Sequence, residues 1–466
     1  MNVALGFVIL LLIGFSASRL TLFRERFSLG TQYLFFAGTE FLIIGLLAGP
    51  TVSNVLNQDA LRQLSPVLSL CLGWIGLLIG LQFDHKVIAR IPLRIWIVGV
   101  IISLITFVVC FGFIISSIPW FFDLFGREFI PKRTLSQGRY AGIPDLAFLL
   151  GCIAAVSTYS ALALLKRSTD AKGDMTKLLQ LLTDVRSPIA VLVMGIWYCF
   201  NHPTSIRIDV IKEATVTQAS TAGIDAVNTI SAPIVNVMSG FEWLILTLLL
   251  GYILGWLLHY LTNHRLGKNE MLLLMTGAVI FSGGLSSYLR LSPLFVNMIM
   301  GITLANLPNF ACSRIISRML ETEKPFFVIF MILAGAMWPP ITPTVLLLAM
   351  VYCIARLGGF WLGSWIAVDY FLKPVQRTKG RLGLAMLPQG GVALALAVDF
   401  ALIHPEGIGE MALGIVILAV LLQQLIGPYL LTSVLKSYGD LKPRKNVANQ
   451  NGSSTNPRQT TEEPVL

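Results

Sequence analysis

An acidic, a basic and several hydroxyl side chains interrupt an apolar stretch at residues 179–194, which read LQLLTDVRSPIAVLVM. A charged side chain at the centre of a bilayer costs at least about 2.5 kcal/mol on insertion scales, so such residues usually face a cavity and serve a function. Burial raises the affinity of a carboxylate for a proton, and a nearby cation competes for the same oxygens. The sequence therefore predicts that Asp184 binds a proton or a monovalent cation, with the Thr183 hydroxyl as a neighbouring ligand.

Two further apolar stretches contain breaks. Residues 154–165 read AAVSTYSALALL, and residues 384–397 read LAMLPQGGVALALA. Proline lacks a backbone donor, glycine loosens the backbone, and the freed polar groups are tolerated in lipid only where protein or a water-filled cavity satisfies them. The ends of broken helices also carry partial charges that attract ions. Alternatively, the hydroxyls serve only helix packing and the proline only kinks a helix. The residues expected at a crossing of the two breaks are Ser157, Thr158, Tyr159, Ser160, Pro388, Gln389, Gly390 and Gly391, with Ser157 and Thr158 as cation ligands.

Arg186 and Arg356 also lie in apolar stretches, and we expect both to compensate the charge of Asp184. Arg186 lies about 200° around a helix from Asp184, so Arg356 is the better partner for a direct pair. The alternative is a salt bridge that only fixes helix packing. Asp145 and Asp399 lie near the ends of apolar stretches and are interpreted as charges at the outer rim.

The composition indicates an all-α, polytopic membrane protein. Of its 466 residues 55% are hydrophobic and only 12% are charged, whereas soluble proteins carry roughly 25% charged residues. The net charge of +10 is explained by basic cytoplasmic loops, and no nucleic-acid partner is expected. The sequence has no metal-binding cluster, phosphate-binding loop or nucleophile elbow, so we expect neither an enzyme nor a cofactor.

The apolar pattern predicts about thirteen membrane-spanning helices. With the N-terminus outside and the C-terminus in the cytoplasm, most Lys and Arg residues fall in cytoplasmic loops, as the positive-inside rule requires. Residues 41–50 resemble 295–308, and 66–84 resemble 324–340, which predicts two inverted five-helix repeats with crossed, discontinuous helices. The predicted spans are 3–18, 32–48, 66–83, 95–117, 146–165, 178–200, 241–261, 271–289, 293–307, 326–338, 342–367, 382–403 and 411–435.

Several short segments together resemble the monovalent cation/proton antiporters of the Na+/H+ exchanger-like superfamily. They are FLIIGLLAGPTVSNVL, GWIGLLIGLQFD, AAVSTYS, RLSPLFVNMIMG, FFVIFMILAGAMW and AMLPQGGVALALA, in order over about residues 30–437. The resemblance implies a homodimer in the plasma (inner) membrane, with a transmembrane exchanger domain at 1–437. Within it, the core helices would be at about 66–200 and 326–435, and scaffold helices would form the remainder. Residues 438–466 are polar and unpatterned, which predicts a disordered cytoplasmic tail.

The resemblance also implies a function. In this superfamily an Asp on the helix after the first crossover binds cation or protons in competition, and that position matches Asp184. The sequence departs from the superfamily pattern at Thr183, Gln389 and Gly391, and Arg186 has no counterpart in it. We therefore expect a secondary transporter that exchanges Na+ or K+ for protons by alternating access across the lipid bilayer. The alternatives are a cation-coupled solute symporter on the same fold and a non-transporting, sensor-like or channel-like relative.

Overall fold

The computed structural model describes residues 38–125, 143–158, 162, 173–202, 238–262, 267–308, 325–371, 381–404 and 407–438. Within these ranges the regular secondary structure is helical. The predicted span 3–18, the first part of span 32–48, Tyr159 and Ser160, and the predicted tail after residue 438 lie outside the described residues. The count of thirteen spans and the inverted repeats stay predictions.

The described helices follow the predicted apolar stretches, with ends that shift by several residues. The α8 helix ends at Ala155, and the predicted span 382–403 is two helices, α17 and α18, separated by the non-helical residues 385–390. The helices are α3 (Thr39–Ala48), α4 (Gln58–Gln63), α5 (Ser65–Leu81), α6 (His85–Ile88), α7 (Leu93–Phe125), α8 (Ile143–Ala155), α10 (Asp174–Phe200), α12 (Gly240–Thr262), α13 (Lys268–Tyr288), α14 (Pro293–Asn306), Pro325–Ala336, α16 (Pro343–Phe371), α17 (Arg381–Leu384), α18 (Gly391–Ile403) and α19 (Ile408–Tyr438).

Six of the described helices are long and apolar enough to cross a membrane, namely α7, α10, α12, α13, α16 and α19. Six shorter apolar helices, including α8 and α18, lie among them. Unbroken spans need about 20 apolar residues, so short helices next to chain breaks are the form expected of discontinuous spans. The chain is an integral membrane protein.

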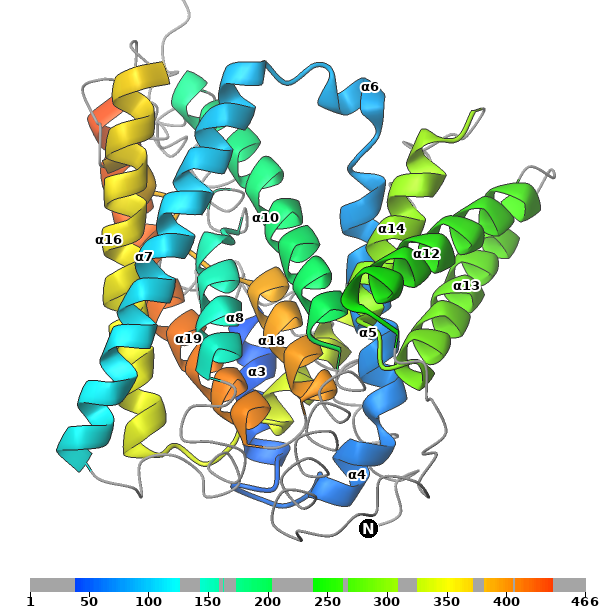
Figure 1. The fold of residues 1–466 in the computed structure, drawn as a ribbon, viewed down its shortest axis with the longest axis horizontal. Helices are drawn as coiled ribbons and strands as arrows, with labels where there is room; N and C mark the ends of the chain where they lie inside the picture. The colour runs from blue at the N-terminus through cyan, green and yellow to red at the C-terminus, as the bar shows by residue number, and fades with distance from the viewer. Residues whose placement is uncertain are drawn as a thin grey trace, which may run out of the picture.

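The helices pack as two groups that lie side by side (Figure 1). In the first, called the crossover group, α7 packs on α16 and α8, α18 packs on α19 and α8, and α10 packs on α7 and α8. In the second, called the α14 group, α5, α12 and α13 pack on α14. The α5 helix, which covers most of the predicted span 66–83, packs mainly on α14 and α13, and the division of the helices into core and scaffold stays a prediction. Apolar periodicity shows that a helix is buried and does not show which neighbours bury it.

The helix Pro325–Ala336 packs on α3 through two glycines that let the backbones touch. A Cβ on Gly45 would lie 2.0 Å from the Ile332 carbonyl oxygen, and a Cβ on Gly335 would lie 2.1 Å from that of Leu42. Any side chain at either position would force the helices apart, so small residues set this close approach.

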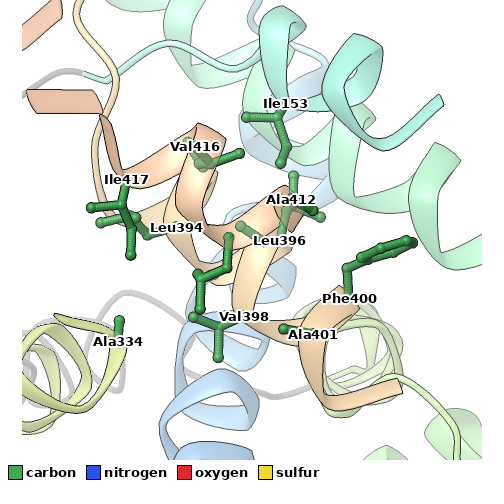
Figure 2. Packing of buried hydrophobic residues seen from close by; sticks show 14 of the residues in the cluster. Ile153, Ala334, Leu394, Leu396, Val398, Phe400, Ala401, Ala412, Val416 and Ile417 are labelled. Carbon is green, nitrogen blue, oxygen red and sulfur yellow. The ribbon is translucent and has the colours of Figure 1, made fainter. Parts of the chain in front are cut away.

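The α18 helix lies at the centre of the molecule. Residues 393–401 are all buried, so this helix has no polar face and no lipid face. Figure 2 shows Leu394, Leu396 and Val398 of α18 packed among side chains of α8, α19 and the helix Pro325–Ala336. A helix that is apolar on all sides is typical of a protein interior. This position fixes the start of α18, and with it the chain break at residues 385–390.

Candidate functional site

The two chain breaks meet inside the crossover group. The backbone N–H of Thr158, just after α8, donates to the carbonyl oxygen of Pro388 at 2.9 Å. Gly390 is required beside this contact, because a Cβ there would lie 2.8 Å from Thr158 Oγ1. Pro388 ends the helical path because it cannot donate to a preceding turn. The structure therefore brings together Ser157, Thr158, Pro388, Gln389 and Gly390 at one crossing, as the sequence predicts.

The broken ends leave carbonyl groups that need donors, and Arg356 of α16 supplies several. Its Nε donates to the carbonyl oxygen of Ala154 at 3.0 Å, and its Nη2 to that of Val156 at 2.6 Å. Its Nη1 donates to the carbonyl oxygen of Leu387 and to Gln423 Oε1. The side chain is fully buried. One guanidinium thus satisfies unpaired carbonyls on both sides of the crossing, where the end of α8 also carries a partial negative charge.

Arg186 of α10 approaches the same crossing from the other side. Its Nη2 donates to the carbonyl oxygen of Ala155 at 2.8 Å, its Nε donates to Ser103 Oγ at 3.0 Å, and its Nη1 lies 3.2 Å from Met386 Sδ. This side chain is also fully buried. Arg186, which has no counterpart in the superfamily pattern, is therefore a second donor to the end of α8.

Both arginines share one aromatic neighbour. The guanidinium carbons of Arg186 and Arg356 lie 4.5 and 4.7 Å from the centre of the Phe360 ring. Guanidinium groups are attracted to the faces of aromatic rings, and the attraction grows as water is removed. Phe360 thereby allows two positive charges to be buried close to one another. The bonds described for both arginines go to neutral acceptors, and charge compensation of Asp184 by either one stays a prediction.

Gln389 joins the break to α8 and α16. Its Nε2 donates to the carbonyl oxygen of Ile153 at 2.9 Å and lies 2.8 Å from the Tyr352 hydroxyl oxygen. Gln424 of α19 donates to the backbone carbonyl of Gln389. The roles of Gln423 and Gln424 are not among those predicted from the sequence. Two adjacent amides in an apolar stretch are nevertheless a usable signal, because such groups need buried partners.

Asp184 lies beside this crossing, on the exposed side of α10. Its neighbour Thr183 is buried and donates to the carbonyl oxygen of Leu179 at 2.9 Å. Ser157 Oγ lies 3.5 Å from Thr183 Oγ1, and Ser187 Oγ donates to the carbonyl oxygen of Ser157 at 3.0 Å. Asp184 is thus exposed, and it directly follows Thr183, whose hydroxyl contacts that of Ser157 after the end of α8.

The face of α10 that carries Asp184 changes character along the helix. Lys177 and Asp184 are exposed, whereas Val191, Gly195 and Tyr198 are buried. The last three residues lie within about 40° of Asp184 around the helix axis, so all belong to one face. The N-terminal half of this face is open, and the C-terminal half is covered.

The helix α14 covers the C-terminal half of that face. The ring of Phe295 is seated against Gly195 so closely that a Cβ there would lie 2.1 Å from Phe295 Cγ. In Figure 1, α10 lies at the side of the crossover group that faces the helices α12 to α14. The exposed part of the face, with Lys177 and Asp184, lies in the half at which α10 begins.

The arrangement limits which atoms can bind a cation. The carbonyls of residues 154, 155, 156 and 387 accept hydrogen bonds from the arginines, and the carbonyl of 157 accepts one from Ser187. The Asp184 carboxylate and the hydroxyls of Thr183, Ser157 and Thr158 stay the cation ligands that the sequence predicts. Carboxylate and hydroxyl oxygens are suitable ligands for a hard cation.

The fold is that of a monovalent cation/proton antiporter. Two structures of the sodium proton antiporter MjNhaP1 from Methanocaldococcus jannaschii are similar to this chain. The structure determined at pH 8 has a TM-score of 0.59 and 16% identity, covering 93% of this chain and 100% of the antiporter chain. The second, an electron-microscopy structure, has a TM-score of 0.53 and 14% identity, covering 97% and 99%. No protein-family model and no curated protein matches the sequence.

Proposed function

We propose that this protein exchanges a monovalent cation, Na+ or K+, for protons across the membrane, by competition at Asp184. The observation that carries the proposal is an exposed carboxylate beside Thr183 and Ser157, where two broken helices cross and only one half of α10 is open. The fold shared with a sodium proton antiporter supports it.

The mechanism follows from the charge of one carboxylate. Asp184 is neutralised by a proton or by a cation that the hydroxyls of Thr183, Ser157 and Thr158 help to bind. A bare carboxylate in the closed, dry interior would cost several kcal/mol, so only the two neutralised states can pass between the two sides. Binding on one side and release on the other then couple the two fluxes. Arg356 and Arg186 hold the crossing together while α10 moves relative to α14.

A single exchanging carboxylate gives a one-for-one, electroneutral cycle, because the site carries the same charge with a bound proton as with a bound monovalent cation. We also propose a homodimer in the plasma (inner) membrane, with the N-terminus outside and the C-terminus in the cytoplasm. In that orientation the open half of the α10 face points to the cytoplasm. An exchange rate that changes with an imposed membrane potential would contradict electroneutrality.

Proton flux in proteoliposomes tests the proposal. Addition of Na+, K+ or Li+ should drive protons across the membrane of vesicles that contain the wild-type protein. Asp184→Asn should abolish this proton flux. The matched control is Asp174→Asn, which makes the same change at an exposed position on the same helix. Full flux in Asp184→Asn would remove the site assignment.

A second candidate function is a non-transporting relative in which the two buried arginines lock the crossing. The observation that favours it is that the guanidiniums occupy carbonyls which a cation could otherwise use. This second function would be supported if none of the cations tested drove proton flux while purified protein still bound a cation. A coupled solute symporter would instead show flux only when an organic solute accompanies the cation.

A further inference from the structure

In contrast to the exposed Asp184, a buried acid of α18 lies near the covered end of the α10 face. Asp399 of α18 is 0% exposed, which corrects the interpretation of this residue as a rim charge. Its Oδ2 accepts a hydrogen bond from Ser292 Oγ at 2.6 Å. Ser292 is the N-cap of α14 and accepts the backbone N–H of Phe295 at 3.0 Å. The bond between Asp399 and Ser292 therefore joins the crossover group to the α14 group.

The carboxyl of Asp399 is only partly compensated, since besides Ser292 it faces one backbone N–H, that of Leu294 at the start of α14. Within the described residues, Asp399 Oδ1 and the Tyr198 hydroxyl are buried without a hydrogen-bond partner, and no ion pair includes Asp399. An ionised carboxylate with one oxygen unpaired in an apolar interior is costly, whereas a protonated one carries no charge.

Among the described residues, no basic side chain forms an ion pair with Asp399, and Arg290, two residues before Ser292, is exposed. Tyr198 faces Asp399 from α10, and Cys152 of α8 lies near Tyr198. The sequences of α5, of α14 and of residues 411–435 in α19 contain no Asp, Glu, Lys or Arg. His404, on the same helix as Asp399, stacks on Phe400 with ring centres 4.6 Å apart. A proton is therefore the simplest neutralising partner for this carboxyl.

A small recess lies at the same junction, lined by Tyr198, Cys199, His202, Arg290 and Ser292 among others. Arg290 is exposed, so it lies toward the solvent, while Cys199 is 2% exposed and lies inside. Separation of α10 from α14 would widen this recess and admit water to Asp399. A proton lost from the carboxyl would pass to that water.

We propose that Asp399 is a second proton-binding site, a latch that keeps α10 and α18 closed on α14 while it is protonated and releases them when it loses the proton. The latch makes opening of this end dependent on pH, separately from cation binding at Asp184. A role of the latch in transport rests on the proposed exchange function. The pH-dependent opening itself does not, because it depends only on the contact between Asp399 and Ser292.

The native thiol of Cys199 reports this opening. The experiment measures the rate at which N-ethylmaleimide modifies Cys199 in protein reconstituted in lipid nanodiscs, by peptide mass spectrometry, between pH 5 and pH 9. Thiol ionisation raises the rate with pH in every variant, so the quantity of interest is the ratio of wild type to Asp399→Asn. Asparagine keeps an uncharged acceptor for Ser292. We expect a ratio near one at low pH and a ratio of about ten at high pH, since a shift of 1.4 kcal/mol is tenfold.

A second variant protects the test against misfolding of the first. Ser292→Ala removes the latch bond, so it should raise Cys199 modification several-fold even at pH 5, whereas Cys110, buried between α7 and α16, should be unaffected. A constant ratio for Asp399→Asn at all pH values, or unchanged modification in Ser292→Ala, would overturn the latch. No ion gradient is needed, so absent transport with pH-dependent labelling would disprove the exchange function alone.

Discussion

The two halves of the α10 face differ, although they belong to one helix. Around Asp184 the face is exposed and polar, and two hydroxyls and a chain break lie behind it. Around Gly195 the same face is covered by Phe295 of α14, and the nearby acid, Asp399, is fully buried. What packs against the helix decides the role of each half. The N-terminal half of the face is exposed, and the C-terminal half is covered by α14.

This difference gives alternating access a concrete form. The crossing of the two breaks lies between the open and the closed half, and its carbonyls are held by Arg356 and Arg186. If the closed half opened and the open half closed, Asp184 would face the opposite side without any change at the crossing. Small rigid-body movements of packed helices are a common basis of such switches.

The largest effect is expected from removal of the donor that holds the crossing. Arg356→Met leaves the carbonyls of Ala154, Val156 and Leu387 without their donor. Each unsatisfied buried acceptor costs about 1–3 kcal/mol, so we expect a loss of at least about 3 kcal/mol in stability. Thermal unfolding in detergent should show a much lower Tm, whereas Arg94→Met, at an exposed position, should leave it unchanged. A wild-type Tm for Arg356→Met would contradict the role given to the guanidinium.

A smaller effect is expected when the contact between Gly195 of α10 and Phe295 of α14 is disturbed. Gly195→Ala places a Cβ 2.1 Å from Phe295 Cγ, so the ring must move and the covered half should loosen. We expect several-fold faster modification of Cys199 by N-ethylmaleimide. Gly112→Ala is the matched control, because a Cβ there meets nothing within 4 Å. Equal Cys199 rates in both variants would show that this contact does not seal the face.

The smallest effect concerns the open half. Thr183→Val removes one hydroxyl beside Asp184 and keeps the shape of the side chain. Loss of one neutral ligand worth about 0.5 kcal/mol should raise the apparent KM for the cation roughly twofold while the maximal flux is retained. Thr276→Val is the control, because Thr276 makes the same 2.9 Å bond to the carbonyl four residues earlier, in α13. An unchanged KM for Thr183→Val would exclude this hydroxyl from the site.

The sequence predicts the parts of the site that depend on residue type within one segment. Pro388 and the adjacent glycines mark a break that the structure contains, and Ser157 and Thr183 are brought together as expected. Gln389, which the sequence places at the crossing, lies there and bonds to the Ile153 carbonyl. Local backbone chemistry is sufficient for these inferences, because breaks in apolar spans must be satisfied nearby.

The sequence could not predict partners that depend on packing between distant helices. The bonds of Arg356 to the carbonyls at the crossing could not be foreseen, since they arise because this residue enters from α16 beside the end of α8; its pairing with Asp184 stays a prediction. Asp399 was interpreted as a rim charge because it lies near the end of its own apolar stretch. That position does not reveal that α14 begins beside it, at Ser292. Both outcomes follow from tertiary contacts that periodicity does not encode.

Proton release from purified protein on cation binding tests the central claim most directly. Na+, K+ or Li+ is added to weakly buffered, detergent-solubilised protein, and the released protons are followed with a pH indicator. If one carboxylate holds either ligand, wild-type protein should release up to about one proton per bound cation, and Asp184→Asn should release none. Equal release from wild type and Asp184→Asn would contradict competition at Asp184.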